Sequence, residues 1–242
     1  RGGPSGQPKA TEASPICRAR VAIAPCCSIN WRGGTVGPGG YGPGHGKRRK
    51  RAMTVTETGD RTVEGPHLRL RLVRPDDADY ILSLRKDPRY NAHLSPVTGT
   101  VADQRAWIAG YKAREAAGLE YYYVIERRDD GTPCGVVRLY DIAGDRFTWG
   151  SWILDENKPP KAALESAVLS FDIAFGPLAL GIADIDVRKG NVGAIHFYRR
   201  YGATETHADA LNLYFRLEKA VHFAHRAERM AVLRQGADAI NL

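Results

Sequence analysis

The chain has 242 residues, a length that fits one or two domains. Its formal charge of +8 suggests an anionic partner, but that charge is confined to one segment. Residues 1–52 carry ten Lys or Arg side chains against the single acid Glu12, whereas residues 53–242 carry 25 basic and 26 acidic side chains. The near-neutral remainder argues against a nucleic-acid-binding surface outside the first 52 residues.

Residues 1–52 are rich in glycine and proline and have no sustained hydrophobic period. Such a segment buries too little apolar surface to offset its ordering entropy, so we predict a disordered tail. The apolar run Val21–Pro25 is too short for a signal peptide or a membrane span. The basic cluster Lys47–Arg51 would suit nucleic acid or a nuclear address. The three cysteines of this segment lack a fourth metal ligand at a usual spacing, and we expect no metal site.

Another interpretation is that residues 1–52 are not natural protein. The chain begins with Arg1, and Met53 is followed at once by ordinary acidic sequence. The purine-rich codons of Gly46–Arg51 match what a bacterial ribosome-binding site would give if it were translated. We therefore hypothesise that translation starts at Met53. The remaining Cys134 is a lone thiol, which fits a reducing cytoplasm.

Residues 53–65 are predicted to be a linker, residues 66–220 a folded domain, and residues 221–242 a helical extension. His67–Val73 alternates strictly between leucine and polar residues, as half-buried strands do. Two helices follow, at Tyr80–Lys86 and at Val101–Ala117, and the loop 91–100 joins them.

Three strands then follow in quick succession, and a helix comes after them. The strands are Tyr121–Arg127, Cys134–Asp141 and Phe147–Leu154, and the helix is Lys161–Phe175. Strict alternation along the third strand predicts two faces. One would hold Phe147, Trp149, Ser151 and Ile153, and the other Thr148, Gly150, Trp152 and Leu154.

The segment from Gly181 to Ala203 is the most informative part of the chain. Its strand places Ile182, Asp184 and Asp186 on one face. A helix then begins after Asn191, a favoured N-cap residue, and ends at Gly202. Asn191 and Tyr198 are seven residues apart, so they share one face of that helix. A last strand, Asn212–Glu218, and a helix at Val221–Gln235 complete the prediction.

This order of elements predicts an α+β fold. We expect a mixed, mostly antiparallel sheet of six to seven strands, flanked by about four helices. The pattern Asn191-x-x-Ala194-x-x-x-Tyr198-x-x-x-Gly202 after a strand, together with that order, resembles the GCN5-related N-acetyltransferase (GNAT) family across nearly all of residues 66–220. The resemblance implies that Asn191 steadies the pantetheine arm of acetyl-CoA and that Tyr198 protonates the departing thiolate. The alternative is an amphipathic helix whose tyrosine only packs.

The resemblance also implies a coenzyme site at the third strand and the helix after it. Backbone amides of Trp152, Ile153 and Leu154 would pair with pantetheine, and Lys161, Ala162 and Ala163 would hold the pyrophosphate. This loop departs from the family pattern, because Pro160 stands where Arg or Gln is usual and Glu165 where glycine is usual. Glu165 would then be a general base for the amine, a carboxylate bonded to backbone at the helix start, or a sign that coenzyme binding is lost.

On the acceptor side, the resemblance points to the loop that holds Tyr90 and His93 as substrate-binding, although His93 could equally be an exposed loop histidine. Trp149 would suit stacking on a base or sugar ring, or it belongs to the core. Besides Glu165, the candidate bases are Glu126, Asp141 and Asp155. Direct transfer is favoured over an acyl-enzyme, since no histidine pattern accompanies Cys134.

We therefore expect a cytoplasmic, acetyl-CoA-dependent N-acetyltransferase that acts on a primary amine, without a metal, nucleic acid or membrane partner. Within the family, the chain resembles the branch of ribosomal-protein N-terminal and nucleotide-amino-sugar acetyltransferases, and a nucleotide-linked amino sugar is the favoured acceptor. The alternatives are a protein N-terminal acetyltransferase and a catalytically silent acyl-CoA-binding domain. The C-terminal extension either contributes to a homodimer or caps the sheet.

Overall fold

The computed structural model describes residues 61–235, which lie in one compact unit. The predictions for the tail, for most of the linker and for residues 236–242 lie outside the described residues. The described chain forms an eight-stranded sheet in the order β1-β2-β3-β4-β5-β6-β8-β7. Every neighbouring pair is antiparallel except β5 and β6, which are parallel. The strands are Val63–Glu64 (β1), Leu68–Leu72 (β2), Tyr121–Arg127 (β3), Pro133–Ala143 (β4), Arg146–Leu154 (β5), Ile182–Arg188 (β6), Thr204–Ala208 (β7) and Asn212–Glu218 (β8).

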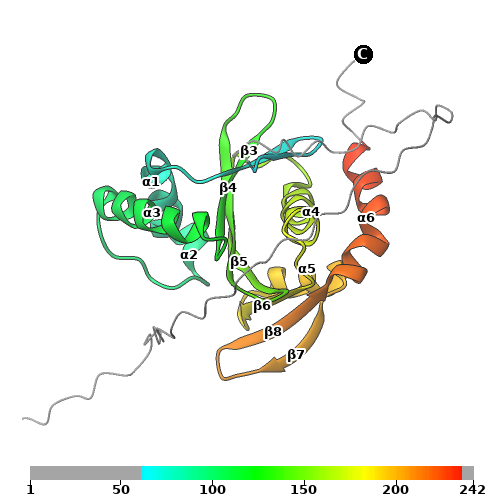
Figure 1. Cartoon of the computed structure of the whole chain (residues 1–242). Helices are drawn as coiled ribbons and strands as arrows, with labels where there is room; N and C mark the ends of the chain where they lie inside the picture. Colours follow the sequence, from blue (N-terminus) through cyan, green and yellow to red (C-terminus); the bar gives the residue numbers. More distant parts are fainter. Residues whose placement is uncertain (1–60, 236–242) are drawn as a thin grey trace, which may run out of the picture. The chain divides into compact units, whose positions relative to one another are not determined.

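Helices cover both faces of the sheet (Figure 1). One face carries α1, α2 and α3 over a core that includes Ile81, Ile108 and Tyr122. The other carries α4, α5 and α6 over a larger core that includes Trp149 and Phe171. The helices are Ala78–Lys86 (α1), Pro88–Asn91 (α2), Val101–Ala116 (α3), Ala162–Phe175 (α4), Val192–Tyr201 (α5) and Lys219–Arg234 (α6), and a short 3-10 turn at Pro75–Asp77 precedes α1.

The structure confirms the α+β fold and contains every strand and helix located in the sequence, although the eight strands and six helices of the described residues exceed the expected six to seven and about four. It adds β1, β7 and α2. Strand β1 has only two residues, too few to show a period. Strand β7, with the sequence TETHA, is exposed at all five positions and has no buried face, so it exists only through its pairing with β8. Helix α2 is a single turn that Asp87 caps.

The predicted faces of β5 are wrong beyond Gly150. Between Gly150 and Ile153 the strand has one residue more than its partner β4, which is the signature of a β-bulge. Ser151 takes up the strain with a positive φ of 49°. The bulge therefore moves Trp152 to the face of Trp149, and their ring centroids are 5.0 Å apart.

The parallel pairing of β5 with β6 is short. It joins Arg146, Phe147 and Thr148 to Ile182, Ala183 and Asp184, and no pairing continues beyond Thr148. The bulge begins two residues later, so β5 bends just where it separates from β6. The two strands enclose a split that opens toward the start of α5.

Glu165 in the first turn of α4 ties that helix to β2. Its side chain is fully buried, and its Oε1 accepts hydrogen bonds from the backbone nitrogens of His67 (2.7 Å) and Leu68 (2.8 Å). The His67 ring donates from Nδ1 to Oε2 at 3.0 Å. A Cβ on Gly65 would lie 2.3 Å from Oε1, so glycine is needed at that position. Glu165 is thus a buried carboxylate that organises the edge of the sheet.

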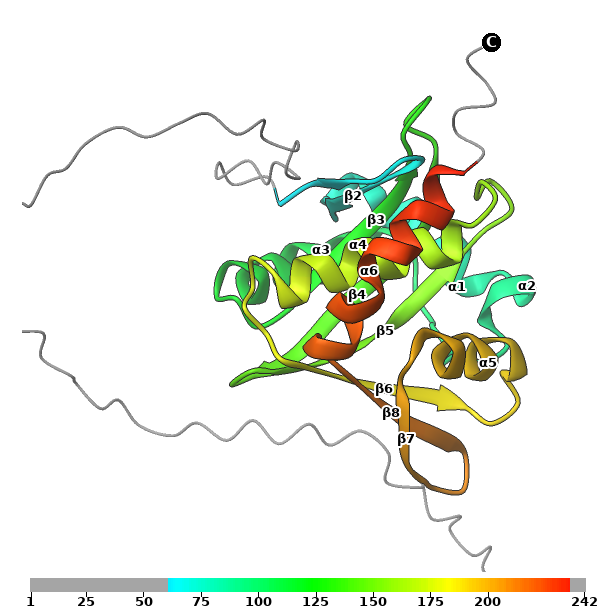
Figure 2. The same ribbon diagram turned by 90° about the vertical axis from the view of Figure 1, so that its right-hand side faces the viewer.

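Helix α6 lies across α4 and is attached by a buried polar chain (Figure 2). Asp172 of α4 accepts from Nε2 of His222 at 2.9 Å, and the Tyr201 hydroxyl lies 3.1 Å from Nδ1 of the same ring. Arg226 donates to both oxygens of Asp172. Burial opposes the charge of Asp172, but the hydrogen bonds from His222 and Arg226 prevail and hold its pKa below the ordinary value.

Asp172→Asn should destabilise the protein by about 3–5 kcal/mol, because it leaves the buried partners of the carboxylate without their charge. Urea unfolding followed by circular dichroism measures this loss. Since the folded pKa of Asp172 is depressed, its contribution is present above the unfolded pKa, near 3.9, and is lost as the pH falls through the folded value. The difference in unfolding free energy between wild type and variant should therefore shrink in acid.

Glu228→Gln, on the exposed side of α6, is the matched control and should leave stability unchanged. An equal effect of both changes would contradict this account of α6.

Candidate functional site

Two pockets open on opposite sides of the split between β5 and β6. The larger, of about 1200 Å³, lies on the face of α4, α5 and α6, and we call it the large pocket. The smaller, of about 380 Å³, lies on the face of α1 and α2, and we call it the small pocket. Trp152 and Asn191 line both. The two pockets are therefore neighbours whose linings have these two residues in common.

The large pocket is apolar along β5 and cationic around its rim. Trp152 and Leu154 of β5, with Ala194 and Phe197 of α5, form the apolar part. The charged lining consists of Lys158, Lys161, Arg200 and Arg229 against the single carboxylate of Glu228. An extended ligand with an apolar arm and phosphate groups suits this combination.

The first turn of α4 forms one end of the large pocket. Lys161, its N-cap, has a left-handed backbone (φ 64°), and Ala163 and Leu164 face the pocket. A helix N-terminus attracts anions through its dipole and its free N–H groups. The Lys161 ammonium donates to the carbonyl oxygens of Val232 (2.7 Å) and Gln235 (2.6 Å), so it also holds the end of α6. Ala162 is buried in the core and lines neither pocket.

Glu165 lines neither pocket, which removes the concern that its carboxylate repels a pyrophosphate. Its contacts with His67 and Leu68 also leave it no access to an amine in either pocket. The catalytic role predicted for Glu165 is therefore wrong. If the protein binds coenzyme A, the sequence left Glu165 as either a general base or a carboxylate bonded to the backbone. The structure shows the second arrangement.

Asn191 and Tyr198 occupy the positions that the sequence pattern requires. The Asn191 side-chain oxygen accepts from the Ala194 backbone nitrogen at 3.2 Å and caps α5, and its amide nitrogen has no hydrogen bond within residues 61–235. Tyr198 lines the small pocket, and its ring packs against Trp149, Trp152 and Phe215. Burial, followed by the charge of Asp186, raises the pKa of Tyr198, so its phenol is neutral at physiological pH.

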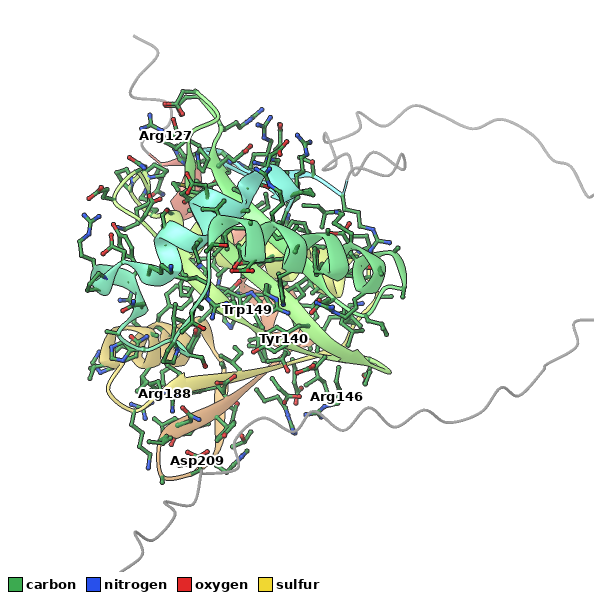
Figure 3. All side chains as sticks on the ribbon, turned by 90° about the vertical axis from the view of Figure 1, so that its left-hand side faces the viewer. Arg127, Tyr140, Arg146, Trp149, Arg188 and Asp209 are labelled. Carbon is green, nitrogen blue, oxygen red and sulfur yellow. The ribbon has the colours of Figure 1, made fainter. Side chains whose placement is uncertain are left out.

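The small pocket brings together α1, the loop after α2, and the strands around the split. Tyr90, His93 and Ile153 line it, as do Arg85 and Arg188. His93 also lies against the turn before α5, since a Cβ on Gly190 would be 3.5 Å from its ring. In Figure 3, Tyr140 lies below the layer of α1–α3, and Arg188 lies at the end of β6 remote from Arg146.

Trp149, which the sequence suggested as a substrate-binding residue, lies outside both pockets. It is fully buried, its indole N–H donates to Ser170 of α4 at 2.9 Å, and it lines neither pocket. The reason for the error is that α4 covers this face of β5, where Trp149 packs against Phe171, while Trp152 lines both pockets.

None of the other carboxylates considered as bases lines either pocket. Glu126 pairs with Arg69 and Arg71, and Asp155 accepts from the Tyr80 hydroxyl at 2.7 Å. Asp141 lies on an exposed part of β4, outside both pockets.

The thiol of Cys134 offers no nucleophile. It is fully buried and lines neither pocket, and burial raises its pKa to about 12. Because the thiolate is the reactive form, an acyl-enzyme at this position is disfavoured.

Several lining residues were missed from the sequence. Arg85 belongs to α1, and its guanidinium reaches only the Ser95 carbonyl oxygen, at 3.4 Å. Burial lowers the pKa of Arg85, and nearby Arg138 lowers it further. His225 and Arg229 of α6 line the large pocket. No local pattern marked these residues, because only the packing of their helices brings them to the pockets.

Among residues 61–235, no cluster of three or more His, Cys, Asp or Glu side chains is placed to hold a metal ion. Within the same range, no helix has the length and apolar character needed to cross a membrane.

A family model described as an acetyltransferase (GNAT) domain matches residues 67–204. A search of curated proteins found no match. Among solved structures, the chain is similar to FdhC, described as a nucleotide-linked sugar GNAT in its apo form. The identity is 37%, the TM-score is 0.65, and the match covers 69% of this chain and 95% of that one.

Two more distant structures share the fold. Mycobacterium smegmatis RimJ in complex with CoA-disulfide matches at 18% identity and a TM-score of 0.58, covering 69% of this chain and 88% of that one. The ribosomal-protein-S5-alanine acetyltransferase from Vibrio fischeri matches at 15% identity and a TM-score of 0.57, covering 65% and 96%.

Proposed function

The chain belongs to the GNAT family of acetyltransferases, and from this premise we propose that it transfers an acetyl group from acetyl-CoA to the primary amine of a nucleotide-linked amino sugar. The observation that carries the proposal is the pair of pockets that meet at Trp152 and Asn191. Coenzyme in the large pocket and acceptor in the small pocket would bring thioester and amine together through the split, beside Tyr198.

The large pocket suits coenzyme A along its whole length. The pantetheine arm would follow β5 at Trp152, Ile153 and Leu154, where the separation from β6 leaves backbone groups without a partner strand. The pyrophosphate would lie at the first turn of α4, with Lys161 and Ala163. Arg200, which has no ion pair within the described residues, would supply further positive charge for phosphate.

Tyr198 would act on the leaving sulfur. A neutral phenol donates a hydrogen bond to the thiolate as the C–S bond breaks. Because the pKa of Tyr198 is raised, the phenol keeps its proton until the CoA thiolate forms and accepts it. Asn191, with a free amide nitrogen at the junction of the pockets, would orient the end of the pantetheine arm.

The small pocket supports an anionic acceptor. Arg85 and Arg188 both line it, and neither has a carboxylate partner within residues 61–235. Unpaired guanidinium groups are suited to bind phosphate in a bidentate manner. The likeness to a nucleotide-linked sugar GNAT, at 37% identity, points to the same class of acceptor.

Tyr198→Phe should lower kcat for acetyl transfer by about 100-fold or more, because the thiolate loses its proton donor. Calorimetric titration should give an unchanged Kd for acetyl-CoA, since Tyr198 does not line the large pocket. With the pKa of Tyr198 raised, its loss of a proton should not reduce wild-type kcat below about pH 10. Tyr214→Phe, whose hydroxyl bonds Asp209 on the β7–β8 hairpin, is the control and should keep wild-type kcat. Full activity of the Tyr198 variant would exclude the role assigned to this phenol.

The acceptor class is tested with UDP-glucosamine, free glucosamine, spermidine and a peptide that begins with alanine, each with acetyl-CoA. UDP-glucosamine should give the highest kcat/KM. Arg85→Gln should raise its KM by about 10- to 100-fold, the value of a charged hydrogen bond, and leave the KM for free glucosamine unchanged. Arg105→Gln, on the exposed face of α3, is the matched control. A preference for the peptide or for spermidine would contradict the proposed acceptor.

A further inference from the structure

The small pocket contains one carboxylate among the residues that the structure describes, and it is Asp186 of β6. Alternation along β6 sends Ala183, Ile185 and Val187 into the core, so Asp186 points away from the core on the opposite face. Its position along β6 is beyond Asp184, the last residue that pairs with β5. Asp186 is therefore an exposed side chain that lines the small pocket, on the part of β6 that no longer pairs with β5.

Asp186 has no structural partner, in contrast to Asp184 two residues earlier. Asp184 accepts from Arg146 at 2.6 Å and lies 3.6 Å from Arg216. Asp186 has no hydrogen bond or ion pair within residues 61–235, although Arg188 follows it on the same face. The two carboxylates on this face of β6 therefore differ. Asp184 is paired with arginines of the sheet, whereas Asp186 lines the small pocket.

The surroundings of Asp186 are phenols, which neutralise none of its charge. Tyr140 of β4 and Tyr198 of α5 line the same pocket, and Tyr214 of β8 is its cross-strand partner. The negative charge of Asp186 adds to burial in raising the pKa of Tyr198 and Tyr140. The other titratable side chains of this pocket lie on β6 (Arg188), on α1 and α2 (Arg85, Tyr90), on the loop after α2 (His93) and on β3 (Tyr122).

We propose that Asp186 is the catalytic base, binding the ammonium group of the acceptor and accepting its proton before attack. This rests on the proposed function only in that an amine enters the small pocket. The carboxylate lines the same pocket as Tyr198, so the group that takes the nitrogen proton and the group that gives a proton to sulfur belong to one cavity. The cations of the pocket, Arg85 and Arg188, remain for an anionic part of the acceptor.

The protons and bonds balance with these groups alone. The ammonium gives one proton to Asp186, and the free amine attacks the thioester carbon to form the C–N bond. The C–S bond breaks, and the thiolate takes the proton of Tyr198. The second nitrogen proton restores the phenol, and Asp186 releases its proton to water. Each turnover yields one amide, one free CoA thiol and one proton.

The test compares wild type, Asp186→Asn and Asp184→Asn by release of the CoA thiol from acetyl-CoA. UDP-glucosamine is one acceptor, and ethylamine and trifluoroethylamine at high concentration are two others. Ethylamine is almost fully protonated at neutral pH, whereas trifluoroethylamine is mostly free amine. The kcat/KM is measured from pH 6 to pH 10, and calorimetry gives the Kd for acetyl-CoA.

For Asp186→Asn, the kcat/KM with UDP-glucosamine or ethylamine should fall by about 100-fold at neutral pH. The deficit should shrink as the pH rises, because solution then supplies free amine. The variant should stay close to wild type with trifluoroethylamine and should bind acetyl-CoA normally. Asp184→Asn should show no pH-dependent loss.

A loss that is the same at every pH and for both small amines would overturn the base role, as would wild-type rates in the Asp186 variant. Release by wild type with the small amines but not with UDP-glucosamine would count against the proposed acceptor, while Asp186 is still judged from the small amines. If no amine supports release by wild type, the proposal is overturned too, because the small pocket then takes no amine.

Discussion

The geometry of the site depends on one break in hydrogen bonding, where β5 leaves β6 after three residue pairs. Most strands of a sheet satisfy their backbone groups with a neighbour, but here the far half of β5 has lost one neighbour. The bulge at Ser151 follows this separation and brings Trp152 into the lining of both pockets. Both pockets, and the residues they share, exist because of this separation.

Two buried carboxylates, each with several hydrogen-bond partners, hold α4 and α6 in place. Glu165 fixes α4 against the start of β2, and Asp172 fixes α6 against α4 through His222 and Arg226. Paired in this way, buried charges resist displacement, since each separation would leave a charge uncompensated. The carboxylates of Glu165 and Asp172, which have hydrogen-bond partners, therefore have a structural role. Asp186, without a partner, is available for chemistry.

The sequence predicted the architecture well because most elements carry a strong local signal. Alternation in β2, the capping residues of α5 and the Asn191–Tyr198 spacing each reflect short-range physics. The errors arose where tertiary structure decides. A single bulge reversed the faces of β5 beyond Gly150, the packing of α4 buried Trp149, and long-range bonds to His67 and Leu68 gave Glu165 a structural use. Asp186 was visible as a polar residue on an alternating strand, but only the structure distinguishes it from Asp184.

The most direct test of this account is a crystal structure of the protein with CoA and UDP-glucosamine. The account predicts that the CoA sulfur lies at the split, within hydrogen-bonding distance of the Tyr198 hydroxyl, with the pyrophosphate at the first turn of α4. The amine should approach from the small pocket beside Asp186. Coenzyme bound away from β5, or a sulfur remote from Tyr198, would contradict it.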